Sequence, residues 1–118
     1  SIFLSIDVAV PCGLLINELV SNALKYAFQG DTGRTPEIRI RMSLQNDCAI
    51  SLSVEDNGVG IPEGIDFKDT QSLGLKLVSI LVEDQLHGEM RVERNQGTAF
   101  HIHFMLEETV LTERTSAA

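Results

Sequence analysis

The sequence predicts an α+β fold, a two-layer α/β sandwich in which helices cover one face of a mixed, mostly antiparallel sheet. In several short segments apolar residues occupy every second position, which is the period of a half-buried strand. Two longer segments, residues 11–28 and 72–86, place apolar residues three and four apart, as in amphipathic helices. The expected element order is β-α-β-β-loop-α-β-β, within one domain at residues 1–108.

The N-terminal part predicts a short strand and then a long helix. Residues 2–6 show a short apolar alternation that favours a strand. Pro11 predicts the start of the helix, because proline is favoured in a first helical turn. The helix is expected to end near Phe28, since residues 30–36 contain the glycines and the proline typical of a loop.

A β-hairpin is expected next. Apolar residues alternate with polar ones over residues 38–45 and 48–55, and the turn between them falls at Asn46 and Asp47. Such a pattern predicts one buried and one solvated face. The alternation then breaks over residues 56–71, where glycine and proline predict a long loop, and ordered loops of this length are usually functional.

The second half predicts a helix and two more strands. Residues 72–86 have helical periodicity, and Gly88 follows at a position typical of a C-cap. Met90 and Val92 predict a short strand, and residues 100–106 predict a final one. The inward-facing helix residues are expected to be Leu73, Leu77, Val78 and Leu81.

Composition limits the function classes. The net charge of -8 is not offset by a basic patch, so we expect no general nucleic-acid binding. Cys12 and Cys48 lack metal-ligand spacing, which indicates reduced cysteines in a cytoplasmic protein. No apolar run approaches the ~20 residues of a membrane span, so no direct membrane contact is expected. The chain does not begin with Met and reads as a piece of a longer protein, whose residues 109–118 are expected to fray.

A polar stripe runs along the first predicted helix. Glu18, Asn22, Lys25 and Gln29 follow one another at i, i+4, i+7 and i+11, which places them on one face. A carboxylate can accept a proton, an amide oxygen suits Mg²⁺, and an ammonium group attracts phosphate. Tyr26 beside them could pack on a base. The alternative is a solvated polar face, which explains the stripe at least as well when it is taken alone.

Strand parity directs two polar side chains toward the helix-covered side of the sheet. Asp56 has the parity of the inward-facing Val54, and Thr98 has that of Phe100. A buried carboxylate needs a hydrogen-bond donor, and the exocyclic amine of adenine would supply one. Asp56 could instead cap the turn that follows it. Both interpretations stay open at this point.

Glycines mark two further candidate positions. Gly58 and Gly60 allow close backbone approach, although for two glycines taken alone a flexible turn is the better explanation. Gly74 and Leu75 lie where the second helix begins, and free N–H groups at a helix N-terminus bind phosphate. An ordinary N-cap by Ser72 is the alternative.

Four segments together resemble known motifs, in the known order. Residues 17–26 match an N box, and residues 56–60 match a D-x-G-x-G box. Residues 72–75 match a reduced second glycine box, and residues 97–100 match a late Gly-Thr motif. The chain thus resembles the catalytic and ATP-binding domain of sensor histidine kinases, in the superfamily of gyrase, heat-shock chaperone, histidine kinase and MutL ATPases. The extended match at residues 10–19 is similar to a subgroup with a shortened lid.

The resemblance implies a Bergerat-type ATP-binding fold with ATP and Mg²⁺ as cofactors. Asn22 would hold Mg²⁺, Glu18 would act near the transferred phosphoryl group, and Asp56 would bind the adenine amine. Residues 61–71 would form a mobile ATP lid. Further implied ATP contacts are Lys25, Tyr26, Gly58, Gly60, Ile61, Gly74, Leu75 and Thr98.

The implied activity is transfer of the ATP γ-phosphoryl group to a histidine on a separate dimerisation domain, with a response regulator as a further partner. That histidine domain is absent from the fragment, which should bind ATP without completing autophosphorylation. Thr70 and Ser72 replace glycines common in the family, and Phe67 alone remains of the usual aromatic box. The alternatives are a protein serine kinase of the anti-sigma-factor type and a nucleotide-binding module without transfer activity.

Overall fold

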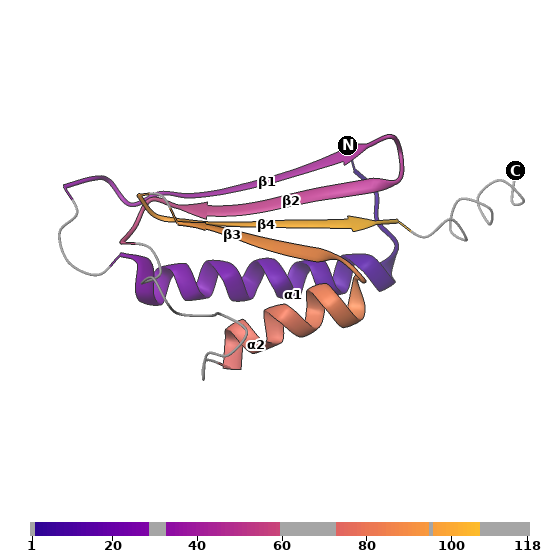
Figure 1. Cartoon of the computed structure of the whole chain (residues 1–118), viewed down its shortest axis with the longest axis horizontal. Helices are drawn as coiled ribbons and strands as arrows, with labels where there is room; N and C mark the ends of the chain where they lie inside the picture. Colours follow the sequence, from indigo (N-terminus) through magenta and orange to yellow (C-terminus); the bar gives the residue numbers. More distant parts are fainter. Residues whose placement is uncertain (1, 29–32, 60–72, 95, 107–118) are drawn as a thin grey trace, which may run out of the picture.

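The computed structural model describes residues 2–28, 33–59, 73–94 and 96–106 (Figure 1). Two helices lie on one face of a four-stranded sheet, so the predicted two-layer α+β fold is confirmed. The helices are α1 (Ile6–Asn22), continued by the π-helical turn η1 (Ala23–Ala27), and α2 (Leu73–Ile80), continued by the π-helical turn η2 (Leu81–Gln85). The strands are β1 (Ile38–Gln45), β2 (Ala49–Asp56), β3 (Glu89–Arg94) and β4 (Thr98–Met105).

The sheet has the order β1-β2-β4-β3, and every pairing among its described strands is antiparallel. The hairpin turn lies where the sequence predicts it, with φ of 53° at Asn46 and 59° at Asp47. These positive values suit a tight hairpin connection. The register pairs Asp56, the last residue of β2, with Thr98, the first residue of β4. The two inward-facing polar residues are therefore neighbours at one end of the sheet.

The core lies between the helices and the central strands. Leu15 and Leu19 of α1 are almost completely buried against it, as are Leu52 of β2 and Ile102 of β4. Full burial of one such side chain contributes about 1.5–3 kcal/mol. In the second helix Val78 and Leu81 are buried as predicted. Val82 of the same helix, Ile50 of β2 and Phe104 of β4 are fully buried as well.

The predicted N-terminal strand is wrong. Ile2 and Leu4 are partly buried against the core but lie in no strand, and α1 begins at Ile6, before Pro11. The backbone carbonyl of Ser5 accepts the first helical hydrogen bonds. Pro11 therefore lies inside α1, where it is buried and supplies no backbone donor.

Two other expectations need correction. Ile40 and Leu44 of β1 have the predicted inward parity but remain 47% and 38% exposed, because the helices cover the central strands and leave this edge strand open. At the end of the second helix His87, rather than Gly88, has the left-handed φ of 53°. Gly88 serves close packing instead, since a Cβ there would lie 2.6 Å from the carbonyl oxygen of His103.

The helix Ile6–Ala27 is long and apolar enough to cross a membrane by length and composition, with a mean hydropathy of 1.2 over its best window. Core helices of soluble proteins also meet this criterion. In the structure the helix packs Leu15 and Leu19 against the sheet. The sequence expectation of no membrane-length apolar segment therefore holds only for uninterrupted apolar runs.

Some sequence expectations concern residues outside the described ranges. They are the end of the polar stripe, part of both glycine boxes, the lid with its sequence departures, and the C-terminal tail. These positions are Gln29, Gly60, Ile61, residues 61–71 with Phe67 and Thr70, Ser72 and residues 109–118.

Candidate nucleotide site

A pocket of about 80 Å³ lies between the helices and the sheet, at the end where β2 stops and β4 starts. It joins residues from four separate parts of the chain, including five that the sequence singled out. The lining residues are Leu19, Asn22, Ala23, Tyr26, Ala27, Val54, Asp56, Leu75, Thr98 and Phe100. The N-box helix, the D-x-G-x-G turn, the start of α2 and the Gly-Thr motif thus meet at one site.

Asp56 caps the turn and also lines the pocket, while its contact with adenine stays a prediction. Its Oδ1 accepts a hydrogen bond from the Gly58 N–H at 2.9 Å, so the carboxylate caps the turn. Asp56 also lines the pocket beside Thr98, which is only 5% exposed. Within the described residues the carboxylate makes no second hydrogen bond, which leaves its other oxygen available to a donor in the pocket.

The glycines after β2 and before β4 allow close backbone contacts. A Cβ on Gly58 would overlap the carbonyl oxygen of Ala27, and the same oxygen accepts the N–H of Val59 at 2.7 Å. Gly97 has a φ of +139°, and a Cβ there would overlap the carbonyl oxygen of Asp56. Both turns are therefore packed tightly around Asp56, one of them against the end of α1.

The residues that the sequence predicts to act near the phosphates also lie close together. A Cβ on Gly74 would lie 2.7 Å from Glu18 Oε2 and 3.2 Å from Asn22 Nδ2, so the start of α2 stands directly on the polar stripe. Asn22 Nδ2 is buried and has no hydrogen-bond partner among the described residues. A buried amide without a partner costs about 1–3 kcal/mol, and such a group favours an added ligand.

These residues suit Mg²⁺ only together with phosphate. Among the described residues no group of three His, Cys, Asp or Glu side chains could hold a metal ion alone. Mg²⁺ in nucleotide sites is usually held by one or two protein ligands, several waters and phosphate oxygens. Asn22, whose Nδ2 has no partner among the described residues, fits that pattern beside the Glu18 carboxylate, since a turned amide would present its oxygen.

The π-helical turn at the end of α1 sets the positions of Lys25 and Tyr26. Both side chains are exposed, and Tyr26 at 58% exposure still lines the pocket rim. Ala23 and Ala27 are buried walls of the same pocket, and neither is a candidate site residue from the sequence. Their small side chains directly follow Asn22 and Tyr26, and this adjacency is the signal that could have identified them.

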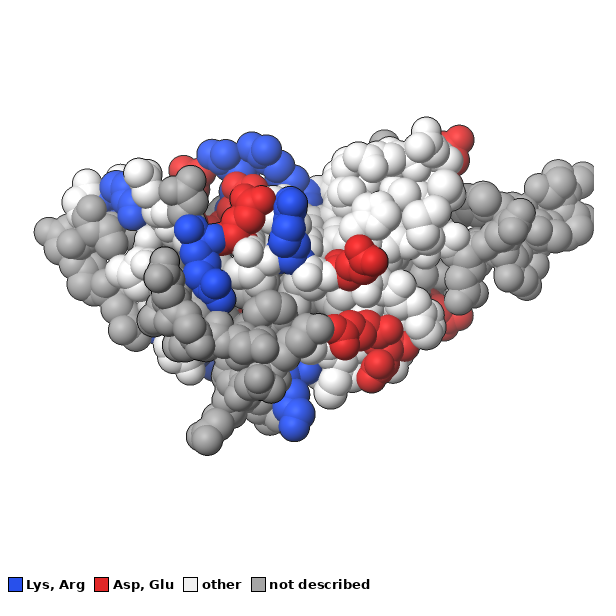
Figure 2. All heavy atoms as spheres, in the orientation of Figure 1, with Lys and Arg blue, Asp and Glu red and all other residues white. Residues whose placement is uncertain are grey.

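A larger hollow of about 550 Å³ lies on the open face of the sheet, away from all these residues. Long side chains such as Arg41 and Arg91 stand around it, together with His101 and His103. Figure 2 shows basic and acidic side chains interleaved along the visible side of the molecule. Glu93 lies 3.2 Å from Arg91 and 3.5 Å from His101, two residues that line the hollow. We therefore locate the site by its chemistry and not by the size of the hollow.

Comparison with known proteins identifies the family of the chain. Residues 8–108 match the family of histidine kinase-, DNA gyrase B-, and HSP90-like ATPases. Blue-light-activated histidine kinase 2 of Erythrobacter litoralis is 32% identical over 114 residues, which cover 93% of this chain and 32% of that protein. The sensor histidine kinase PdtaS of Mycobacterium tuberculosis is 35% identical over 95 residues, covering 78% of this chain and 18% of that protein.

Solved structures show the same architecture. The histidine kinase domain of a blue-light activated kinase from Erythrobacter litoralis superposes with a TM-score of 0.78 at 33% identity, over 87% of this chain and 46% of that one. The catalytic domain of histidine kinase ThkA shares the fold with a TM-score of 0.65 at 24% identity, over 81% of this chain and 66% of that one. The chain therefore belongs to the histidine kinase-, DNA gyrase B- and HSP90-like ATPase family, whose ATP-binding α+β fold it has.

Proposed function

We propose that this chain is the ATP-binding catalytic domain of a two-component sensor histidine kinase. It would transfer the γ-phosphoryl group of ATP to a histidine on a separate dimerisation domain. One observation carries the proposal: two groups of residues meet at the same pocket between the helices and the sheet. The first group is Asp56 with Thr98, and the second is Glu18 with Asn22 and Gly74. The first group suits a base and the second suits a magnesium-bound phosphate chain.

The adenine would lie against Val54, Leu75 and Phe100, which are apolar walls of the pocket. Its exocyclic amine would donate to the Asp56 oxygen that the Gly58 cap leaves available. The pocket, at about 80 Å³, is below the ~300–1,000 Å³ of typical ligand sites. Tyr26, whose side chain is exposed, lies at the rim of this pocket.

At the other end the backbone N–H groups of Gly74 and Leu75 would meet the phosphates, because a helix N-terminus attracts anions. Asn22 would be the protein ligand of Mg²⁺, which neutralises phosphate charge when bound. Lys25, with its exposed side chain, would add a positive charge near the phosphates. Gly58 and Gly97 keep the base end closely packed.

In the transfer step a nitrogen of the acceptor imidazole forms a bond to the γ-phosphorus while the bond to the β-phosphate oxygen breaks and ADP leaves. Glu18 would orient the imidazole by accepting its other N–H proton in a hydrogen bond. Such reactions depend chiefly on positioning and charge neutralisation. The closeness of Glu18 and Asn22 to Gly74 supports such a role for these residues.

The partners follow from the same proposal. The chain spans about a third of the length of the first curated relative and less than a fifth of the second. The acceptor histidine domain, a response regulator and a cytoplasmic location are therefore proposed for the whole protein. The relatives are named as histidine kinases, which favours a histidine over a serine as the acceptor.

The proposal is tested by mixing the chain with γ-labelled ATP, Mg²⁺ and the histidine-bearing helical domain of its parent protein. We expect a label on that domain that acid removes and base does not, as a phosphohistidine requires. An acid-stable label would identify a serine kinase instead. Tight ATP binding without any transferred label would identify a nucleotide-binding module.

A further inference from the structure

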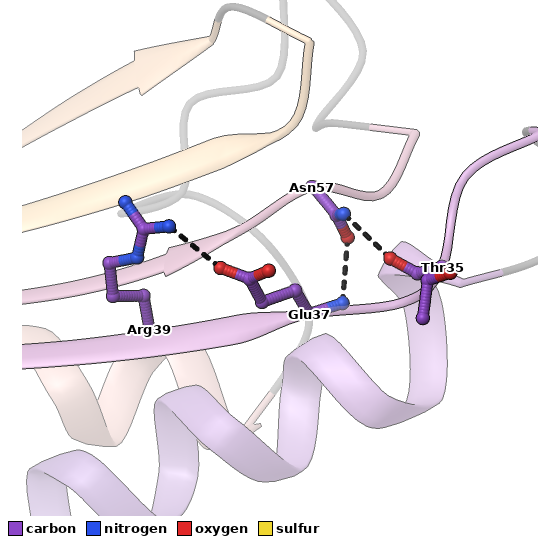
Figure 3. A network of polar contacts seen from close by, with 4 residues as sticks. All are labelled: Thr35, Glu37, Arg39 and Asn57. Atoms are coloured by element: carbon purple, nitrogen blue, oxygen red, sulfur yellow. Dashed lines mark hydrogen bonds and ion pairs between the residues drawn. The ribbon is translucent and has the colours of Figure 1, made fainter.

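The side-chain amide of Asn57, in the turn after β2, makes the hydrogen bonds to backbone groups that a neighbouring strand would make. Its Oδ1 accepts the backbone N–H of Glu37 at 2.8 Å, and its Nδ2 donates to the carbonyl oxygen of Thr35 at 2.8 Å (Figure 3). The Asn57 N–H also donates to the Glu37 carbonyl at 3.3 Å. Since the regular β1–β2 ladder ends at the pair Ile38 and Asp56, the side-chain amide extends the pairing by a further rung.

Arg34 ties the same turn to a second one. Its guanidinium donates to the carbonyl oxygen of Gly58 at 3.3 Å and to that of Gln96 at 3.1 Å. Gly58 is the residue whose N–H donates to the Asp56 carboxylate. Gln96, with a φ of 53°, lies just before Gly97 and Thr98. A planar guanidinium with several donors is suited to hold two carbonyl groups in one fixed geometry.

Neither Asn57 nor Arg34 lines the pocket, yet both lie beside the backbone that carries its two polar groups. The Asp56 carboxylate is oriented by the Gly58 N–H, so its direction depends on the shape of this turn. A recognition group held in place before binding loses less entropy when the ligand arrives. A looser turn would leave Asp56 present but poorly directed.

We propose that Asn57 and Arg34 are positioning residues that set the preference of the pocket for a purine bearing a 6-amino group. They act through the turn that orients Asp56 beside Thr98. This inference rests on the proposed adenine role of Asp56. It predicts that their loss weakens discrimination between bases more than it weakens binding of the nucleotide as a whole.

The test compares ATP with purine riboside triphosphate, which lacks the 6-amino group, by titration calorimetry with Mg²⁺. The wild-type chain should bind ATP at least about tenfold more tightly, since a hydrogen bond to a charged group contributes about 1.5–3 kcal/mol. In Asn57→Ala and in Arg34→Gln this ratio should fall by about three- to tenfold. The control Arg41→Gln removes an exposed arginine of β1 away from the turn and should keep the wild-type ratio.

The outcomes separate the positioning role from a structural one. Circular dichroism melts identify which variants are folded. If Asn57→Ala does not fold, Arg34→Gln still tests the positioning role. If wild type discriminates and the folded variants retain the same ratio, the positioning role is wrong, even if both affinities fall together. If wild type does not discriminate, the adenine role of Asp56 is itself wrong and the inference is overturned with it.

Discussion

Gly74→Ala should separate activity from stability at the phosphate end of the site. The new Cβ would lie 2.7 Å from Glu18 Oε2, 3.2 Å from Asn22 Nδ2 and 3.5 Å from Asn22 Oδ1. Ordinary contacts lie near ~3.5 Å, so the carboxylate must withdraw by roughly 0.5–1 Å. The closest atom is the end of a flexible side chain, and the backbone has no need to move.

The stability change should be small, because two effects oppose each other. Alanine is favoured over glycine in helices by up to about 1 kcal/mol. A displaced Glu18 rotamer costs about 0.5–1.5 kcal/mol. The net change should stay within about 1 kcal/mol, a shift of the melting temperature by no more than about 4 °C.

Phosphoryl transfer should suffer far more than folding. A misplacement of about 1 Å near the reacting atoms costs up to about 100-fold in rate. We expect a ten- to hundredfold lower single-turnover rate of transfer from γ-labelled ATP to the histidine domain, measured beside a thermal melt. Gly13→Ala is the matched control, because nothing lies within 4 Å of its new Cβ. Unchanged transfer in folded Gly74→Ala would refute the placement of the reaction at Glu18 and Asn22.

Three other substitutions or reagents test separate parts of the account. Gly58→Ala should destabilise the fold by about 2–4 kcal/mol in urea unfolding, because its Cβ would overlap a backbone oxygen of Ala27; a loss below about 0.5 kcal/mol would contradict that packing. Asn22→Ala should abolish the gain in ATP affinity that Mg²⁺ confers in calorimetry, and a retained gain would exclude Asn22 as the metal ligand. Burial raises the pKa of the Cys12 thiol, so iodoacetamide at pH 8 should label the half-buried Cys48 first, and equal rates would contradict the burial. Since native Cys12 keeps its proton more tightly than the unfolded chain does, its contribution to stability is present below the usual thiol pKa and is lost as pH rises through the raised value.

The central strands and the base end of the site could be predicted from sequence because a strand has a strict period of two. Once Val54 and Phe100 are assigned inward, Asp56 and Thr98 must follow them, and the structure makes them register partners. The helical stripe was less decisive. Only its contact with Gly74, which joins distant parts of the chain, distinguishes a site from a solvated face.

What the sequence could not predict depends on tertiary contacts. The exposure of Ile40 follows from where the helices lie over the sheet, and strand parity carries no information about that. α1 starts before Pro11, and Leu4 and Val8 on either side of that start pack partly buried against the core, a contact that local sequence preference does not reveal. The contacts of Arg34 link a loop residue to two distant carbonyl groups, and no periodicity marks such a residue.

The most direct test of the account is calorimetric titration of Mg²⁺-ATP into the wild-type chain and into Asp56→Asn. The replaced side chain keeps an oxygen that can accept the Gly58 N–H, so the turn and the fold should persist. Its NH₂ group, however, would face the adenine amine, and two hydrogen-bond donors cannot pair. The account predicts ATP binding by wild type and an affinity at least about tenfold lower for the folded variant. Equal affinities would contradict the adenine site.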